Sequence, residues 1–276
     1  MQDLVFFERD PFSPIRYAYE VKGQLHREQS EFQEILVLDL AHFGRALVLD
    51  GVVQLTERDE YLYHEMLTQV ALHSHPSPES VLIVGGGDGG SLREVAKHET
   101  VTRIDLVELD PKVVEVCRRF LPTLATSFND PRLSITHTDG AQFLKQADQR
   151  YDLVIVDCTD PVGPAQALST REFFADCVGC LKAEGMFVAQ TESLHFHRHF
   201  VADVQRHLSQ LFPIADLYTA ALATYAGNWW TFSVGSKSRD PRTQARTCQV
   251  PARYYSDDVH AQSFLPGSLY QKLMQE

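Results

Sequence analysis

Residues 81–90 have the sequence VLIVGGGDGG, in which an apolar run leads into a cluster of glycines. The apolar run predicts a buried strand, and Gly85, Gly87 and Gly90 match the G-x-G-x-x-G pattern of a turn between a strand and a helix. About 20 residues further on, Glu108 ends the next apolar run, where a carboxylate can accept hydrogen bonds from ribose hydroxyls. The spacing predicts a nucleoside-binding site and leaves open whether the ligand is a dinucleotide or an adenosylmethionine.

The regions on both sides of this stretch differ in their pattern. Downstream, strands alternate with helices, which favours a parallel sheet with right-handed crossovers. The expected strands are 104–107, 133–135, 153–156, 186–189, 215–219 and 229–235, and the expected helices include 91–97 and 112–120. Upstream, short apolar runs predict strands, and Asp50-Gly51 between two of them is a strong hairpin signal. A helix is expected from about residue 57. We therefore predict a β-strand domain at 1–70 and an α/β domain at 71–276.

Residues 151–164, YDLVIVDCTDPVGP, place two carboxylates just after a predicted buried strand. The Pro-x-Gly-Pro segment prevents a helix from starting at once, so Asp157 and Asp160 should lie at the carboxyl edge of the sheet, where open α/β sheets bind ligands. Asp88 should reach the same edge, and its charge argues against a pyrophosphate there. Carboxylates this close are costly without a cation. Magnesium is conceivable, but an organic polycation fits better, and we predict no metal site.

Composition excludes several other classes of protein. The 276-residue chain carries a formal charge of −12, which disfavours nucleic acid as a partner. No apolar run reaches the roughly 18 residues of a membrane span, and the first residues do not resemble a secretory signal, so a cytoplasmic location is expected. The five cysteines are scattered, and Cys177 and Cys180 are interpreted as helix packing. The histidine-rich segment 195–199 is interpreted as a solvated face, and Trp229 and Trp230 as residues that pack a strand into the sheet or line the site.

Several motifs, in this order, resemble the spermidine synthases, which are polyamine aminopropyltransferases. They are 56–61, 63–66, 85–90, 157–164, Thr224-Tyr225 and 253–260, so that the resemblance covers nearly the whole chain. One position departs from the pattern, because Ala223 stands where many relatives have proline before the Thr-Tyr pair. The departure lies in the loop on the amine side of the site, so it bears on which amine is the acceptor.

The resemblance implies a methyltransferase-like (Rossmann-like), mostly parallel seven-stranded sheet with helices on both faces, preceded by a small N-terminal β-domain. It implies transfer of the aminopropyl group of decarboxylated S-adenosylmethionine to putrescine, giving spermidine and methylthioadenosine, with no cofactor and with assembly into a homodimer or homotetramer. The implied donor-binding residues are Gln33, Gln54, Asp88, Glu108, Asp139, Gly140 and Asp157. The implied diamine-binding residues are Tyr63, His64, Asp88, Asp160, Gln190 and Tyr225. For Asp139, which would reach an adenine amino group, an N-cap role is equally natural.

The charges of these substrates agree with the residues. Decarboxylated S-adenosylmethionine has lost its carboxylate and is positive at both its sulfonium and its amine, which suits Asp88. Alkyl amines lose protons only near about pH 10, so a base must deprotonate the attacking nitrogen, and we assign that role to Asp157, with Tyr63 and Tyr225 orienting the nitrogen. Cadaverine, agmatine or a triamine remain alternative acceptors. A methyltransferase, a non-catalytic relative and an NAD-dependent dehydrogenase remain alternative functions.

Overall fold

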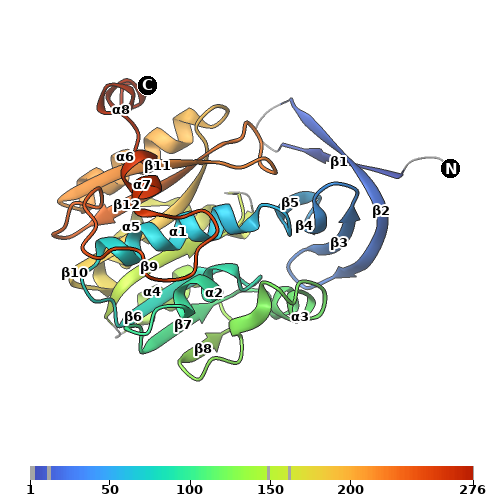
Figure 1. Ribbon diagram of the computed structural model, residues 1–276, viewed down its shortest axis with the longest axis horizontal. Helices are drawn as coiled ribbons and strands as arrows, with labels where there is room; N and C mark the ends of the chain where they lie inside the picture. Colours follow the sequence, from blue (N-terminus) through green and yellow to red (C-terminus); the bar gives the residue numbers. More distant parts are fainter. Residues whose placement is uncertain (1–3, 11–13, 148–149, 161–162, 276) are drawn as a thin grey trace.

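Two sheets form the framework of the protein in a computed structural model, which describes residues 4–10, 14–147, 150–160 and 163–275 (Figure 1). Pro161 and Val162 of the Pro-x-Gly-Pro segment lie outside this range. The first sheet is antiparallel and follows chain order. It contains β1 (Leu4–Arg9), β2 (Arg16–Gln29), β3 (Glu34–Leu40), β4 (Gly44–Leu49) and β5 (Val52–Thr56). The predicted hairpin is confirmed, since Asp50 and Gly51 connect β4 to β5 with φ values of 48° and 82°, as a two-residue turn of this kind requires.

The second sheet has seven strands in the order β11-β12-β10-β9-β6-β7-β8. The strands are β6 (Ser80–Gly85), β7 (Arg103–Val107), β8 (Leu133–Thr136), β9 (Tyr151–Asp157), β10 (Leu181–Ser193), β11 (Ile214–Ala221) and β12 (Trp229–Ser236). All neighbours from β10 to β8 are parallel, whereas β12 runs antiparallel to β10 and β11. The predicted methyltransferase-like α/β sheet is therefore confirmed.

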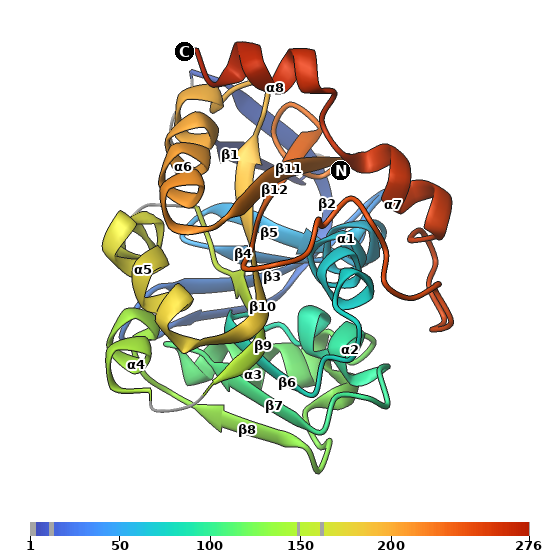
Figure 2. The ribbon, with the colours of Figure 1, turned by 90° about the vertical axis from the view of Figure 1, so that its left-hand side faces the viewer.

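Helices cover both faces of the second sheet (Figure 2). They are α1 (Glu60–Ser74), α2 (Gly90–Ala96), α3 (Pro111–Phe120), α4 (Gly140–Gln146), α5 (Arg171–Cys180), α6 (Arg198–Leu211), α7 (Asp257–Ser263) and α8 (Gly267–Leu273). Successive residues of β6 enter different cores, because Val81 and Ile83 pack with α1, while Leu82 and Val84 pack with α5 and α6. Within the described residues, none of the helices combines the length and the apolar character needed to cross a bilayer. A cytoplasmic location stays a prediction.

The two sheets are joined directly before α1. This helix begins at Glu60, slightly later than expected, and its Met66, Leu67 and Val70 belong to the core of the second sheet. The first sheet instead packs Ile35 and Val37 against α3. The sequence predicts a domain boundary between residues 70 and 71. Because α1 packs on the second sheet, we propose instead that the boundary lies just before α1.

The order of the strands places the site. Crossovers lead from β6 towards β7 on one side and β9 lies on the other, so the ends of β6 and β9 form the point at which an open α/β sheet binds its ligands. Asp157 ends β9, and Asp88 lies in the turn after β6. The first sheet closes this edge from outside, beside α3 (Figure 1).

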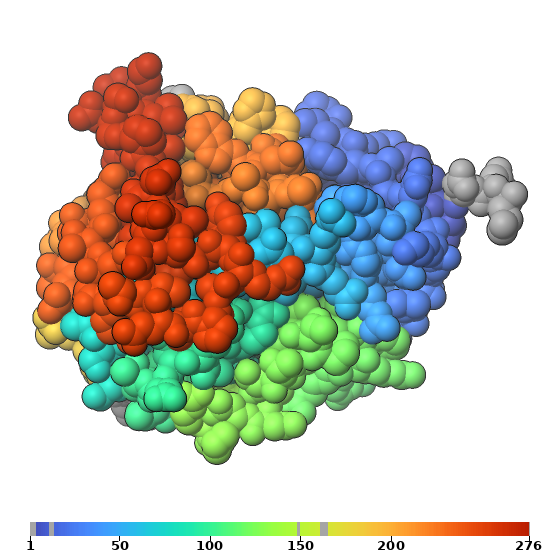
Figure 3. Space-filling model, in the orientation of Figure 1, coloured from blue at the N-terminus to red at the C-terminus, as the bar shows by residue number. Residues whose placement is uncertain are grey.

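The C-terminal segment lies across α1 on the face shown in Figure 3, where it is coloured orange to red. The Glu65 carboxylate holds it by accepting hydrogen bonds from the backbone N–H groups of Arg253, Tyr254 and Tyr255 at 2.7–2.8 Å. Beneath it, the rings of His73 and His98 lie 5.1 Å apart. Burial lowers the pKa of His73 to about 4 and, together with the charge of His73, that of His98 to about 3.

We expect the protein to lose stability as the pH falls below about 6.5, the ordinary pKa of histidine. Between this value and the lowered pKa values, the unfolded chain binds protons that the folded chain excludes. The loss between pH 8 and pH 5.5 should be roughly 1 kcal/mol for each of the two histidines. Urea unfolding at the two pH values measures it. His98→Asn should reduce the difference between the two pH values, whereas His42→Asn on the surface should not; an equal difference in both variants would contradict the assignment.

Candidate active site

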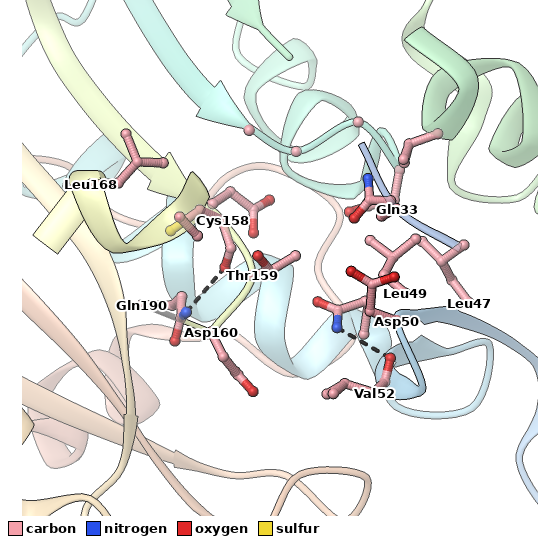
Figure 4. Close-up of a pocket in the computed structure, with 18 of the residues that line it drawn as sticks. Gln33, Leu47, Leu49, Asp50, Val52, Cys158, Thr159, Asp160, Leu168 and Gln190 are labelled. Atoms are coloured by element: carbon pink, nitrogen blue, oxygen red, sulfur yellow. Dashed lines mark hydrogen bonds between the residues drawn. The ribbon is translucent and has the colours of Figure 1, made fainter. Parts of the chain in front are cut away.

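One cavity contains every site residue that the sequence predicted. It lies between the carboxyl edge of the second sheet and the inner strands of the first. Figure 4 shows Cys158, Thr159, Asp160 and Gln190 on one wall, and Gln33, Leu47 and Leu49 on the other. The walls come from segments that are far apart in sequence, so the packing of the two sheets creates the cavity.

The glycine turn fixes the spacing between the ends of β6 and β9. Gly85 has φ +81°, and a Cβ atom there would lie 2.1 Å from the carbonyl oxygen of Asp157. The N–H of Gly86 donates to that same carbonyl at 2.8 Å. A side chain at position 85 would therefore push the two strand ends apart, and glycine is required for this close approach.

The Asp157 carboxylate is held by two hydroxyl groups. Tyr63 donates to Oδ1 at 2.7 Å, and Ser91 donates to Oδ2 at 2.6 Å. Burial, followed by the negative charge of Asp88, raises the pKa of Asp157 above its usual range. The carboxylate is thus oriented and made more basic than an exposed aspartate. Sequence reasoning missed Ser91, because a serine in the first turn of a helix is common and gives no separate signal.

Asp88 and Asp157 form a compact anionic group with His64. One ligand atom from each of the three residues lies within 4.8 Å of the others. His64 places Nε2 3.2 Å from Asp88 Oδ1 and Nδ1 2.8 Å from Glu60 Oε2. A ring nitrogen that donates to a carboxylate has no lone pair for a metal ion, so this histidine is a poor metal ligand. The two aspartates are better suited to an organic cation, which stays a prediction.

The Asp88 pKa reflects opposing effects. Burial raises it, but the charge and the hydrogen bond of His64, together with a hydrogen bond from the N–H of Gly90 at 2.7 Å, outweigh the effect of burial. The net pKa of Asp88 is lowered. Asp88 is therefore held as a carboxylate beside the more basic Asp157.

Glu108 directly follows β7 and lines the cavity, where a nucleoside-binding role stays a prediction. Its carboxylate accepts the N–H of Gly87 at 3.1 Å and the N–H of Asp110 at 2.9 Å. Burial raises its pKa to about 7. Gln33 reaches the same region from the first sheet and donates to Asp110 Oδ2 at 3.0 Å. These residues form a polar wall that suits the hydroxyls of a ribose.

Asp139 lies at the start of α4, with Gly140 beside it, and both line the cavity. The Asp139 carboxylate caps the helix by accepting the N–H of Gln142 at 2.8 Å, so the N-cap interpretation is confirmed. A role towards an adenine amino group stays a prediction. Gly140 leaves no room for a side chain, because a Cβ atom there would lie 2.5 Å from Val84 Cγ1.

Aromatic rings line the middle of the cavity. Tyr225 lies edge-on to Tyr63 with ring centroids 5.6 Å apart, and it packs against Trp230 at 4.5 Å. The Tyr225 hydroxyl donates to the backbone carbonyl of Gln54. Trp230 lines the cavity and belongs to the core of the second sheet, whereas Trp229 is exposed and does not line the cavity, so the interpretation is right for Trp230 and wrong for Trp229. Together the rings form an apolar surface that suits a short alkyl chain.

A second acidic group, which sequence reasoning largely missed, lies at the Asp160 end of the cavity. It consists of Glu8, Asp10, Asp160 and Glu192, together with His197. Burial, followed by the charge of Glu192, raises the pKa of Asp160 well above its usual range, and burial raises the pKa of Glu192 to about 7. Four carboxylates gathered around one buried end of a cavity favour a cationic ligand there.

His197 corrects an interpretation made from the sequence. The segment 195–199 was interpreted as a solvated face, but His197 is buried and lines the cavity. Its Nδ1 lies 3.2 Å from Glu192 Oε2, and its Nε2 lies 3.4 Å from Asp10 Oδ2. The residue begins α6 as its N-cap, and this turn brings the ring back towards the sheet edge.

Glu192 has an unusual backbone conformation. Its φ is 69°, in the left-handed region, and the pairing of β10 with β12 shifts register between Gln190 and Ser193. Bulges of this kind redirect side chains next to active sites, and a non-glycine residue in this region costs of order 1–3 kcal/mol. Its Oε1 is buried and makes no hydrogen bond with any described residue. A strained residue with an unsatisfied buried oxygen indicates a missing hydrogen-bond donor, which a ligand would supply.

Comparison with known proteins gives a consistent result over the whole chain. Residues 60–245 match the family model described as the spermine/spermidine synthase domain, and residues 4–57 match the spermidine synthase tetramerisation domain. The polyamine aminopropyltransferase 1 of Aquifex aeolicus is 50% identical over 274 residues, which cover 99% of this chain and 98% of that protein.

Solved structures agree with this result. The crystal structure of a spermidine synthase in complex with the transition-state analogue AdoDATO superposes with a TM-score of 0.94 at 33% identity, and covers 100% of this chain and 96% of that chain. The spermidine synthase of Thermotoga maritima gives a TM-score of 0.92 at 32% identity, with 100% and 95% covered.

Proposed function

The chain belongs to the spermidine synthase family of polyamine aminopropyltransferases, and from this premise we propose that it transfers the aminopropyl group of decarboxylated S-adenosylmethionine to putrescine. The products are spermidine and methylthioadenosine. The observation that carries the proposal is the presence of two acidic groups in one cavity, Asp88 with Asp157 and Asp160 with Glu192. The aromatic rings that line the cavity between these two groups suit the alkyl chain of a diamine.

The donor site follows from the charges. The adenosine part would lie against Glu108, Asp139 and Gly140, with Gln33 and Gln54 closing it from the first sheet. The aminopropyl group ends in an ammonium, which Asp88 and Asp157 would bind. Ordinary S-adenosylmethionine carries a carboxylate beside this ammonium, and two aspartates would repel it. The same argument disfavours a methyltransferase.

The chemical step is a displacement at the carbon attached to sulfur. Asp157 takes a proton from the acceptor ammonium, and the freed lone pair attacks the methylene carbon of the sulfonium. The carbon–sulfur bond breaks, and its electron pair stays on the sulfur of methylthioadenosine. The raised pKa of Asp157 brings the base closer to the basicity of the amine, while Tyr63 fixes the carboxylate's direction. The sulfonium is already a good leaving group, so positioning supplies much of the remaining rate.

The far ammonium of the acceptor would bind at the second acidic group. Glu8 already uses both oxygens, which accept the N–H of Val53 at 2.8 Å and the hydroxyl of Tyr19 at 3.0 Å. Glu192 Oε1 is the oxygen in need of a donor, and the carboxylate of Asp160 is near enough to Glu192 for the two groups to affect each other's pKa. Gln190 donates to the carbonyl of Cys158 at 3.0 Å and so braces the loop that carries Asp160.

We expect Glu192→Gln to raise the KM for putrescine about tenfold, because a charge-assisted hydrogen bond to the far ammonium is lost. The KM for the donor should stay within about twofold of the wild-type value, since Glu192 lies at the other end of the cavity. Steady-state kinetics with n-butylamine, which lacks the far ammonium, provide the control. The wild-type preference for putrescine over n-butylamine should shrink in the variant. An unchanged preference would contradict the role of Glu192.

A mass-spectrometric assay tests the reaction itself. The purified protein is incubated with decarboxylated S-adenosylmethionine and, separately, with putrescine, cadaverine, agmatine and spermidine. Methylthioadenosine together with spermidine, formed fastest from putrescine, is the expected result. Faster product formation from another amine would show that this amine, and not putrescine, is the preferred acceptor. Methyl transfer from S-adenosylmethionine without aminopropyl transfer would overturn the proposal.

We further propose that the first sheet assembles the chain into a homo-oligomer. The match of residues 4–57 to a tetramerisation domain supports this, and Leu4, Phe7 and Leu25 on β1 and β2 are exposed apolar side chains that a second copy would cover. Light scattering after size-exclusion chromatography distinguishes a dimer from a tetramer by mass.

A further inference from the structure

A line of alternating charges runs from the Asp88 carboxylate away from the cavity. Asp88 Oδ1 pairs with His64 at 3.2 Å, and His64 pairs with Glu60 at 2.8 Å. Arg93 in turn donates two parallel hydrogen bonds to Glu60, from Nη1 to Oε1 at 3.0 Å and from Nη2 to Oε2 at 2.9 Å. Glu60 and Arg93 do not line the cavity, so they reach a ligand only through His64.

The hydrogen bonds of His64 determine its protonation state. A neutral imidazole donates from one nitrogen and accepts at the other, but here each nitrogen faces a carboxylate, which only accepts. Both nitrogens must therefore donate, and the ring is an imidazolium. Asp157 adds a third carboxylate within 4.8 Å, and the Tyr63 ring packs edge-on at 5.1 Å. These groups, with Arg93 behind Glu60, are the charged and titratable residues that face this histidine among the described residues.

The ring is also fixed in position by packing. A Cβ atom on Gly90 would lie 2.3 Å from His64 Cε1, so the ring rests directly on the start of α2. Glu60 and His64 are one helical turn apart on α1, while Arg93 belongs to α2. The contact between these two helices therefore sets the place of the imidazolium relative to the glycine turn that carries Asp88.

We infer that Glu60, which Arg93 holds by two hydrogen bonds, is a positioning residue that orients Asp88 through His64. In this position Asp88 selects a donor with a terminal ammonium. His64 and the N–H of Gly90 both bind Oδ1 of Asp88. Its Oδ2 makes no hydrogen bond with any described residue and remains to receive the ammonium. Without the Glu60 charge, the imidazolium loses one of its two partners. A neutral ring would hold Asp88 less firmly and less often as a carboxylate.

This inference rests on the proposed function, and binding separates the two. The probes are decarboxylated S-adenosylmethionine and methylthioadenosine, which share the nucleoside and differ in the aminopropyl ammonium. In Glu60→Gln, the Kd for decarboxylated S-adenosylmethionine should rise about tenfold at pH 8, and that for methylthioadenosine should change less than about twofold. The donor Kd of the variant should rise further from pH 7 to pH 9 as the ring deprotonates, while the wild-type value stays nearly flat across this range.

Glu94→Gln is the matched control. Glu94 is a buried carboxylate that accepts from the same Arg93 at 2.9 Å, and its other hydrogen bonds and ion pairs are with Gln69 and Lys97 and not with His64. It should leave the ratio of the two Kd values and its pH profile unchanged, whatever it costs in stability. If Glu60→Gln does not fold, Arg93→Lys is the alternative variant. It keeps the positive charge but loses the two parallel hydrogen bonds to Glu60, and it should shift the ratio of the two Kd values in the same direction by a smaller factor.

The outcomes are distinguishable. Failure of the wild-type protein to prefer decarboxylated S-adenosylmethionine over S-adenosylmethionine would remove the proposed function itself. A wild-type preference combined with equal losses for both probes in Glu60→Gln, or with no loss at all, would overturn the positioning role alone.

Discussion

Asp157→Asn is expected to lower kcat by roughly 10³-fold, the range in which removal of a general base falls. The amide keeps the size and the hydrogen bond from Tyr63, but it does not accept a proton from the acceptor ammonium. The buried position makes this loss hard to replace, since burial and Asp88 are what raise the pKa of Asp157. Single-turnover kinetics with saturating donor and putrescine measure the step directly.

Two controls separate this loss from a general defect. Methylthioadenosine should bind to Asp157→Asn with a Kd within about threefold of the wild-type value. The proposed roles of Asp157 are in proton transfer and in binding the ammonium of the donor, and methylthioadenosine has no ammonium. Asp152→Asn makes the same chemical change at the opposite end of β9, where the carboxylate accepts from Lys182 and Ser80 at 2.9 Å. It should lower stability and leave kcat nearly unchanged. A kcat for Asp157→Asn within about tenfold of the wild-type value would assign the base elsewhere.

Asp88→Asn is expected to raise the Kd for decarboxylated S-adenosylmethionine about 100-fold, as the loss of a buried charge-assisted contact predicts. The change also leaves the His64 imidazolium without one of its carboxylates. Methylthioadenosine has no ammonium, so its Kd should change by less than about threefold. Isothermal titration calorimetry with both ligands measures the pair of effects.

Glu108→Gln is the control with the opposite pattern. Glu108 lies at the proposed ribose end, and both ligands carry the same ribose, so this variant should weaken the binding of both by equal factors. The comparison therefore assigns one carboxylate to the ammonium and the other to the nucleoside. Equal losses for both ligands in Asp88→Asn would show that Asp88 acts on the shape of the turn and carries no selectivity for charge.

The positions of the residues in the proposed donor half of the site could be predicted from the sequence because their signals are local. The turn at Gly85–Gly90, the carboxylate of Glu108 after the next strand and Asp157 at the end of β9 each follow directly from a short pattern. In a parallel sheet the carboxyl ends of all strands meet at one edge, so residues in these positions converge without any knowledge of packing. The hairpin at Asp50-Gly51 was predictable for the same reason, since its backbone needs positive φ at both residues.

Only the tertiary structure decided the rest. Glu8 comes from β1, Glu192 from a bulge in β10 and His197 from the start of α6, and no spacing rule connects residues so far apart. They meet because the first sheet packs over the edge of the second, and the pKa values of Glu8 and Glu192 rise because this packing excludes water. Likewise, the role of Glu60 depends on the contact of α1 with α2. Local sequence specifies strand ends and turns, whereas burial and charge pairing between distant segments arise only when the chain has folded.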